Sequence, residues 1–155
     1  MVALSRNPAK SQRLLTLGAD HVFDPADPAL RKKIAAAIAP AKVDLVVDSV
    51  GGALFNQVLA SLGQNGRISV VGRSAGPVPE FNTATLFFRR NRIGGVSVGD
   101  YTPAEAQSSW LEIVRRLDQV NRRPVVDAVF PFTDVKAAFA RLAEGPMGKV
   151  LIRVS

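Results

Sequence analysis

The sequence contains no cysteine and only one histidine, His21. It can therefore form neither a disulfide nor a thiolate metal site, a composition that fits a cytoplasmic protein. No group of histidine, aspartate and glutamate residues has the spacing of a metal site, so we expect no zinc in this chain. His21 lies at the edge of a predicted strand, where we interpret it as a structural residue rather than a general base.

Long apolar runs and aromatic side chains are also scarce. No apolar run approaches the roughly 20 residues that span a bilayer, and the opening MVALSRNPAK lacks the apolar core of a signal peptide. We therefore expect no membrane partner. The net charge is +7, but one tryptophan and one tyrosine do not form a platform for stacking bases. Because the basic residues are scattered, with only short clusters at 31–33, 89–92 and 122–123, we expect no nucleic-acid partner.

Strand and helix patterns alternate through the first hundred residues. Asn7 is a typical helix cap, Pro8 a typical first helical residue and Gly18 a typical helix-ending residue. The segment VDLVVDSV is almost wholly apolar or β-branched, which predicts a strand buried on both faces. The predicted strands are residues 2–5, 21–23, 43–50 and 67–72, and the predicted helices are residues 8–17, 28–38 and 54–62. This alternation predicts the α/β class: a parallel sheet with helices on both faces.

The alternation stops after the strand that ends at Gly72. Thr102 and Glu105 have the spacing of a capping box, with Pro103 at the first helical position. The other predicted elements are a loop at 73–82, a helix at 85–91, a strand at 92–99, a helix at 103–120, a strand at 124–130, a helix from Thr133 and a strand at 149–154. We expect the last part of the chain to be an α+β tail.

Five segments occur in the order and spacing of a known family: SRNPAK, LGADHVFD, VDLVVDSVGG, LGQNGRISVVG and GPMGKVLIRV. Together they resemble the medium-chain dehydrogenase/reductase superfamily, in particular zinc-type alcohol dehydrogenases and zinc-independent quinone oxidoreductases. The resemblance implies that residues 1–100 are a truncated, Rossmann-type dinucleotide-binding domain from its second strand onward. It implies that residues 101–155 are a tail that completes a catalytic domain. The chain would then be a carboxy-terminal portion without the catalytic domain and the glycine-rich loop.

That resemblance has a consequence for the sheet. In the strand order 3-2-1-4-5-6 the first strand lies in the middle. Without it, the predicted strands at 2–5 and 43–50 lose their shared neighbour. Their facing backbone groups then close up on each other, accept a strand from another molecule, or stay unpaired, at about 1–3 kcal/mol for each buried group.

The resemblance also implies a nicotinamide dinucleotide site at the carboxyl ends of the strands. After the first predicted strand, Ser5, Arg6 and Lys10 offer a hydroxyl, a guanidinium and an ammonium with no carboxylate. This set favours the 2′-phosphate of NADP(H) over the 2′-hydroxyl of NAD. A solvated basic turn with an ordinary helix cap is the alternative interpretation.

Two further turns and one lysine complete the predicted cofactor site. Glycines in the turns let the backbone approach a ribose or the nicotinamide end of the cofactor, although a plain strand-to-helix turn with Asp48 as a local cap explains the first turn equally well. Lys149 matches a basic position that contacts the pyrophosphate in related enzymes, and its alternative is a surface lysine. These predicted cofactor-binding residues are Asp48, Ser49, Val50, Gly51, Val71, Gly72, Arg73 and Lys149.

None of these residues is an identifiable catalytic group. The resemblance implies hydride transfer between NADPH and a carbonyl, enone or quinone, and we expect the isolated chain to be inactive because the pyrophosphate-binding loop is not in it. The alternatives are a non-catalytic nucleotide-binding module and a basic nucleic-acid-binding or interaction protein. The segment RIGGVSVG resembles the edge that joins subunits in family dimers, so we expect a homodimer. Its glycines and flanking arginines also fit an edge that avoids pairing.

Overall fold

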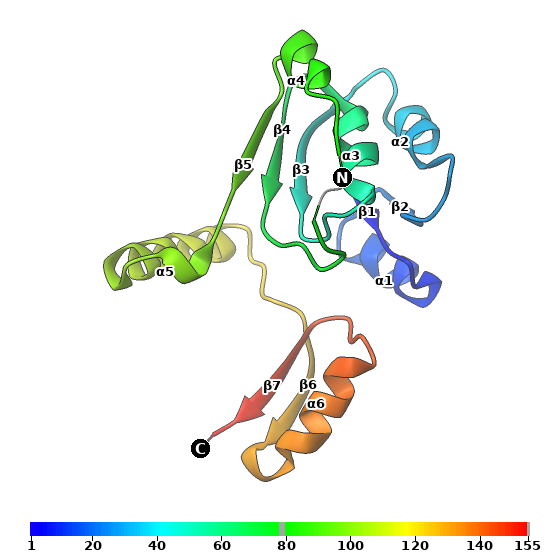
Figure 1. Ribbon diagram of the computed structural model, residues 1–155. Helices are drawn as coiled ribbons and strands as arrows, with labels where there is room; N and C mark the ends of the chain where they lie inside the picture. Colours follow the sequence, from blue (N-terminus) through cyan, green and yellow to red (C-terminus); the bar gives the residue numbers. More distant parts are fainter. Residues whose placement is uncertain (78–79, 155) are drawn as a thin grey trace. The chain divides into compact units, whose positions relative to one another are not determined.

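A computed structural model describes residues 1–77 and 80–154, which form two compact units, Met1–Gly99 and Asp100–Ser155 (Figure 1). The strands of the first unit are β1 (Val2–Leu4), β2 (His21–Phe23), β3 (Val43–Asp48), β4 (Leu62–Val70) and β5 (Arg92–Gly95). Its helices are η1 (Pro8–Lys10), α1 (Ser11–Thr16), α2 (Leu30–Ile38), α3 (Leu54–Ser61) and α4 (Ala84–Arg89), and the short helix η2 (Val98–Asp100) includes the last two residues of this unit and the first of the next. The second unit has α5 (Pro103–Gln119), β6 (Val126–Pro131), η3 (Phe132–Asp134), α6 (Val135–Ala143) and β7 (Lys149–Arg153). Two residues of the predicted loop at 73–82 lie outside the described residues.

Every strand pair in the described residues is parallel. β1 pairs with β2, β3 and β5 flank β4, and β6 pairs with β7. Parallel neighbours need a crossover connection, and the helices between the strands supply it. The prediction of an α/β fold with parallel sheets and helices on both sides is confirmed (Figure 1).

The core of the first unit lies between α3 and the sheet. Its buried members are Phe55, Val58, Leu59, Leu62 and Ile68. The three from α3 recur at helical spacing, so one stripe of the helix faces the strands. Burying each of these side chains contributes about 1.5–3 kcal/mol.

One burial prediction is wrong. Strand β3 was expected to be buried on both faces, but Leu45 is 48% and Val47 is 66% exposed. Val46 points to the other face, where it packs against the core beneath α3. Because successive side chains of a strand alternate between faces, Leu45 and Val47 share the face that no described element buries.

The two sheets of the first unit are separated by an open groove. β1 and β3 are not hydrogen-bonded to each other, and each is the edge of its own sheet. Residues 1–4 form one wall of the cavity between them and residues 41–50 form the other, and its volume is about 660 Å³. We call this cavity the β1–β3 groove. Of the three outcomes expected for these strands, the facing edges stay unpaired.

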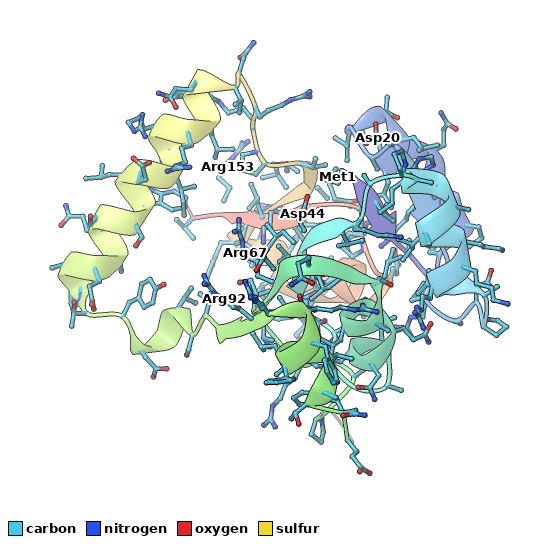
Figure 2. The ribbon with its side chains drawn as sticks, turned by 90° about the horizontal axis from the view of Figure 1, so that it is seen from above. Met1, Asp20, Asp44, Arg67, Arg92 and Arg153 are labelled. Atoms are coloured by element: carbon cyan, nitrogen blue, oxygen red, sulfur yellow. The ribbon has the colours of Figure 1, made fainter. Side chains whose placement is uncertain are left out.

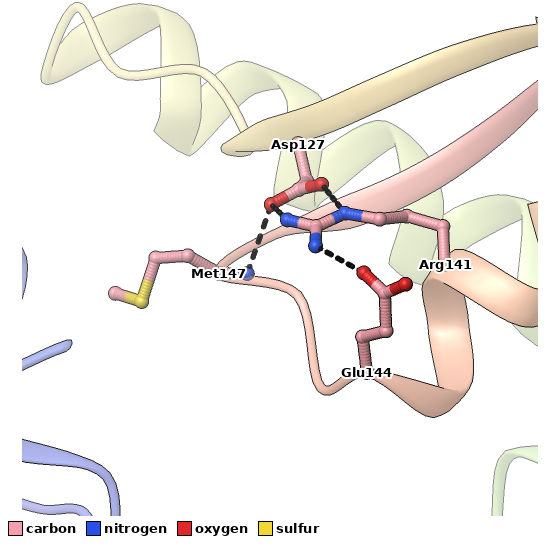
Figure 3. Close-up of polar contacts among 4 residues, drawn as sticks. All are labelled: Asp127, Arg141, Glu144 and Met147. Atoms are coloured by element: carbon pink, nitrogen blue, oxygen red, sulfur yellow. Dashed lines mark hydrogen bonds and ion pairs between the residues drawn. The ribbon is translucent and has the colours of Figure 1, made fainter. Parts of the chain in front are cut away.

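The second unit contains a compact β-α-β motif. α6 connects the parallel strands β6 and β7. Arg141 on α6 donates two hydrogen bonds to the Asp127 carboxylate of β6, at 2.7 and 2.9 Å (Figure 3). Asp127 also accepts the backbone N–H of Met147 at 3.1 Å, just before β7. One carboxylate therefore ties together the strand, the helix and the turn that leads to the next strand.

Helix α5 begins as predicted. The Thr102 hydroxyl accepts the backbone N–H of Glu105, and the Glu105 carboxylate accepts the backbone N–H of Thr102 at 2.8 Å. This reciprocal capping box and Pro103 at the first turn account for the helix boundary.

Candidate functional site

The turn after β3 is held by Asp48. Its Oδ1 accepts the backbone N–H groups of Val50 at 2.8 Å and Gly51 at 3.0 Å. The residue is only 5% exposed, and its Oδ2 has no hydrogen-bond partner among the described residues. Asp48 is thus a local cap, one of its two predicted roles, and it leaves one buried acceptor without a donor.

The turns after β3 and β4 are joined through their backbones. The N–H of Val71 donates to the Asp48 carbonyl at 2.8 Å, which extends the ladder beyond the strand. Further along, the N–H of Ser74 donates to the Ser49 carbonyl at 3.2 Å. Five predicted site residues, Ser49, Val50, Val71, Gly72 and Arg73, are therefore brought together in one pair of interlocked turns.

Sequence reasoning missed part of this second turn. The N–H of Ala75 donates to the Val50 carbonyl at 2.8 Å, and the Gly76 carbonyl accepts the N–H of Gly52 at 3.3 Å. Gly76 precedes Pro77, and a glycine–proline pair is a turn signal that marks this position in the sequence.

Two of the predicted glycines lie where these turns pack closely against each other. Gly51 has φ +68°, and a Cβ on it would lie 2.8 Å from the Gly76 carbonyl oxygen. A Cβ on Gly72 would lie 3.1 Å from the Ser49 carbonyl oxygen. A side chain at Gly51 would therefore be both strained and in collision, whereas one at Gly72 would require the Ser49 backbone to shift by a few tenths of an ångström.

The basic turn after β1 lies beyond the groove. Arg6 is exposed and Lys10 is half-buried. The Ser5 hydroxyl donates to the Asn7 carbonyl at 3.1 Å and accepts the Asn7 N–H at 3.2 Å. Asn7 in turn caps η1 by accepting the N–H of Ala9 at 3.0 Å, as predicted.

This geometry ranks the three polar residues of the turn. The single hydroxyl proton of Ser5 is already used within the turn, so Ser5 donates to an anion only by releasing the Asn7 carbonyl. Arg6 is exposed, and its planar guanidinium offers several hydrogen-bond donors to an anion. Arg6 is therefore the principal anion-binding candidate at this end of the sheet.

Lys149 lies in the second unit, as the first residue of β7. Its backbone N–H donates to the Val125 carbonyl at 2.8 Å. The other predicted site residues all lie in the first unit. The contact of Lys149 with a pyrophosphate stays a prediction.

Two arginines lie where the pairing of β4 with β5 begins. Arg67 of β4 and Arg92 of β5 are partners in the parallel register, next to Leu45 of β3 (Figure 2). Both arginine side chains are exposed. This like-charged pair lies where the pairing of β4 with β5 begins, away from the interlocked turns that follow β3 and β4.

The described residues do not fit a zinc ion. Within residues 1–77 and 80–154 no three histidine, cysteine, aspartate or glutamate side chains gather closely enough to hold a metal. Within the same residues no helix has the length and apolar character needed to cross a bilayer.

Comparison with known proteins identifies the family. The family model described as zinc-binding dehydrogenase matches residues 1–119. Quinone oxidoreductase-like protein 2 of Bos taurus is 27% identical over 156 residues, covering 98% of this chain and 45% of that protein.

Solved structures agree. An NAD-dependent alcohol dehydrogenase superposes with a TM-score of 0.83 at 26% identity, over 99% of this chain and 43% of its own. A mycobacterial protein solved in complex with NADPH has a TM-score of 0.78 at 24% identity, over 98% of this chain and 48% of its own, which shows the common fold. The chain spans less than half the length of these relatives. The match over residues 1–119 and the shared parallel sheet show that the chain belongs to the zinc-binding dehydrogenase family, within the medium-chain alcohol dehydrogenases and quinone reductases.

Proposed function

We propose that this chain is the cofactor-positioning part of an NADP(H)-dependent oxidoreductase. The observation that carries the proposal is the basic, carboxylate-free turn after β1, at the carboxyl end of a parallel strand where open α/β sheets bind ligands. The interlocked turns after β3 and β4 supply a second, glycine-lined surface. The NADPH bound to the mycobacterial structure supports the choice of cofactor.

The proposed roles follow from the chemistry of each residue. Arg6 and Lys10 bind the 2′-phosphate, because a fixed cation beside a phosphate forms charge-assisted hydrogen bonds. The backbone of the turns at Ser49 and Gly72 faces the ribose and nicotinamide portions, and Lys149 contacts the pyrophosphate. When bound, NADPH supplies the hydride for a carbonyl, enone or quinone, and the protein orients it.

Residues 1–100 are proposed as the dinucleotide-binding part and residues 101–155 as the tail of a catalytic domain. Their boundary lies beside the division between the two compact units at Gly99 and Asp100. A cytoplasmic location is part of the same proposal.

Titration of the chain with NADPH and NADH by calorimetry tests the cofactor proposal. We expect NADPH to bind more tightly than NADH, and Arg6→Ala to weaken NADPH binding about tenfold, or about 1.4 kcal/mol, without changing NADH binding. Arg67→Ala is the matched control, because it removes the same charge where the pairing of β4 with β5 begins. Equal affinity for the two nucleotides would contradict the proposal.

The isolated chain is proposed to bind the nucleotide without turning it over. The site residues of the first unit are assigned to positioning a cofactor, and none of them is assigned a catalytic role. The test is the NADPH absorbance in the presence of a quinone acceptor, with and without the chain. Oxidation well above the buffer rate would show that the chain alone is an enzyme.

Two copies of the chain are proposed to pair along β5. All four residues of this strand are exposed, and β5 is the outer strand of its sheet. Its free N–H and C=O groups match those of a second copy related by a twofold axis. Sedimentation velocity at increasing concentration tests this, with Ile93→Pro expected to abolish the dimer.

A further inference from the structure

A smaller cavity lies between α2, the end of α3 and the first residues of β4. Its volume is about 290 Å³, and α2 and α3 lie side by side along it (Figure 1). We call it the α2–α3 cavity. None of its lining residues belongs to the predicted cofactor site, which follows the carboxyl ends of the strands. A ligand in this cavity would therefore be separate from the nucleotide.

One face of α2 lines the cavity. The lining residues of this helix are Arg31, Ile34, Ala35 and Ile38. They follow the spacing i, i+3, i+4, i+7, which places them on one side of a helix. Ala60 of α3 and Leu62 of β4 add further apolar surface. The interior of the cavity is therefore mostly aliphatic.

The charged side chains of the cavity are all positive. They are Arg31 of α2, Lys42 just before β3 and Arg89 of α4, and among the described residues no carboxylate lines the cavity. Lys33 of α2 pairs with Asp27, whereas neither Arg31 nor Lys42 has an ion pair within the described ranges. Cations that line a cavity without a counter-ion attract an anion.

Two of these cations are held in place where α3 ends and β4 begins. Arg89 Nη1 donates to the carbonyl oxygens of Ala60 at 3.1 Å and Leu62 at 2.8 Å, which offsets the partial negative charge at this end of α3. The other two nitrogens of the Arg89 guanidinium have no acceptor in the described part of the chain. The stem of Lys42 packs against Gly63, where an added Cβ would lie 2.6 Å from Lys42 Cβ. Because both side chains are already ordered, a ligand loses little free energy in fixing them.

We propose that the α2–α3 cavity binds a small organic anion with an apolar chain. The anionic head group lies beside Lys42 and Arg89, the chain packs against Ile34 and Ile38, and Arg31 adds to the positive potential. At about 30 Å³ for each non-hydrogen atom, the cavity holds about ten such atoms. Octanoate, a short fatty-acid anion, has this size.

Both parts of the ligand are needed to match the cavity. An inorganic anion would leave the aliphatic interior to water, and a neutral amphiphile would leave the cations without a counter-charge. An alkyl carboxylate and an alkyl phosphate share the required chemistry, because either head group accepts charge-assisted hydrogen bonds from arginine and lysine.

The test is a titration of the full chain with octanoate, followed by the NMR shifts of its backbone amides. We expect saturable shifts at lining residues such as Ile38, Gly63 and Gln64. Acetate has the head group without the chain, and 1-octanol has the chain without the charge. Each should bind at least about tenfold more weakly than octanoate. Hexyl phosphate, an anion of similar size, should also bind, and the ratio of its Kd to that of octanoate shows which head group the cations prefer.

Three results of this titration would overturn the proposal. Equal affinity for octanoate and acetate would show attraction to surface charge alone, and equal affinity for octanoate and 1-octanol would show apolar adhesion alone. Ile34 and Ile38 also line the β1–β3 groove, so the position of the shifts distinguishes the two cavities. Shifts confined to Val2, Leu4 and Leu45 would assign octanoate to the groove.

Variants of the chain test the two parts of the cavity. Lys42→Gln removes the ammonium and keeps a stem beside Gly63, so octanoate should bind about tenfold more weakly, or about 1.4 kcal/mol. Lys32→Gln is the matched control, because it removes the same charge from an exposed residue that does not line the cavity. Ala35→Leu fills the cavity with a good helix former and should also weaken binding, whereas Ala36→Leu, outside the cavity, should not. Equal octanoate affinity within either pair of variants would overturn the proposal.

Discussion

Gly51 cannot carry a side chain without strain, because of its backbone conformation and because of the nearby carbonyl of Gly76. Its φ is +68°, and an added Cβ would lie 2.8 Å from the Gly76 carbonyl oxygen. We expect Gly51→Ala to lower the free energy of unfolding by about 1–3 kcal/mol, measured by urea denaturation. Gly94→Ala is the control, since a Cβ there meets nothing within 4 Å and its φ is not positive, and it should be neutral. Equal urea midpoints for the two variants would contradict the packing of the turns.

Glu112 shows how an exposed residue acquires an unusual titration. Hydrogen bonds from Arg115 and Arg116 lower the pKa of this carboxyl from its ordinary 4.5 to about 2. A carboxylate whose pKa is lowered by folding contributes stability that is present above the unfolded pKa and lost as the pH falls through the folded one. We therefore expect the contribution to α5 to disappear between about pH 4.5 and pH 2. Because the side chains are exposed, its size is small.

The measurement for Glu112 is an NMR titration of its carboxyl carbon. The midpoint should lie near pH 2 in the parent chain and return toward 4.5 when both Arg115 and Arg116 are changed to glutamine. A midpoint near 4.5 in the parent chain would mean that the hydrogen bonds from Arg115 and Arg116 to Glu112 do not persist in solution.

Residues that act on near neighbours in the sequence were predictable. The caps at Asn7, Asp48 and Thr102 each bind a backbone group within three residues, so the sequence alone contains the whole interaction. The exposed fractions of Leu45 and Val47 were not predictable in the same way. Burial of a strand face depends on what covers it, and that covering element is not encoded in the strand.

At the scale of elements, the second unit depends on the contacts of Asp127. This carboxylate accepts hydrogen bonds from Arg141 and from the N–H of Met147. The hydrogen bonds of the Arg141 guanidinium to Asp127 and to Glu144 raise the pKa of Arg141. We expect Arg141→Met to lower the stability of the β6–α6–β7 motif by about 1–3 kcal/mol, because Asp127 is only 10% exposed and would lose its charged donor.

The matched control is Arg123→Met. Its partner Asp118 and Arg123 itself are 55% and 72% exposed, and ion pairs of this kind contribute about 0–1 kcal/mol. Hydrogen exchange of the β6 and β7 amides measures both variants. A similar loss of amide protection in Arg141→Met and Arg123→Met would show that the contact with the buried Asp127 carboxylate stabilises the second unit no more than a surface ion pair does.

The cross-strand pair of Arg67 and Arg92 is an unfavourable contact between elements. Neighbouring like charges on one face of a sheet destabilise it, and opposite charges contribute roughly 0.2–1 kcal/mol. We expect Arg92→Glu to raise the free energy of unfolding of the first unit by an amount in that range. Arg122→Glu, which changes the net charge equally outside any strand, should not. A lower urea midpoint for Arg92→Glu would contradict this reading of the pair.

At the scale of the whole molecule, alternating periodicity was enough to predict the class and order of elements. The strands at His21–Phe23 and Val43–Asp48 and the capped helix α5 lie where the sequence placed them. The open groove between β1 and β3 was only one of three expected outcomes, since the sequence does not state the distance between two strands that share no turn. Likewise, the contact between the turns after β3 and β4 depends on the register of these two strands. The sequence of each turn shows its glycines but does not show that the two turns meet.

The free strand edges also bear on the colloidal behaviour of the chain. At low ionic strength the net charge of +7 keeps molecules apart, but the Debye length falls from about 10 Å at 0.1 M salt to about 3 Å at 1 M. Repulsion then no longer prevents two unpaired edges from meeting. We expect light scattering to rise with sodium chloride, and to rise less for Val47→Pro, which removes a donor from one edge. Scattering that rises equally for the parent chain and for Val47→Pro would assign the attraction to another surface. A smaller rise for Val47→Pro would mean that the salt concentration, by screening the surface charge, determines how long the chain stays dispersed in solution.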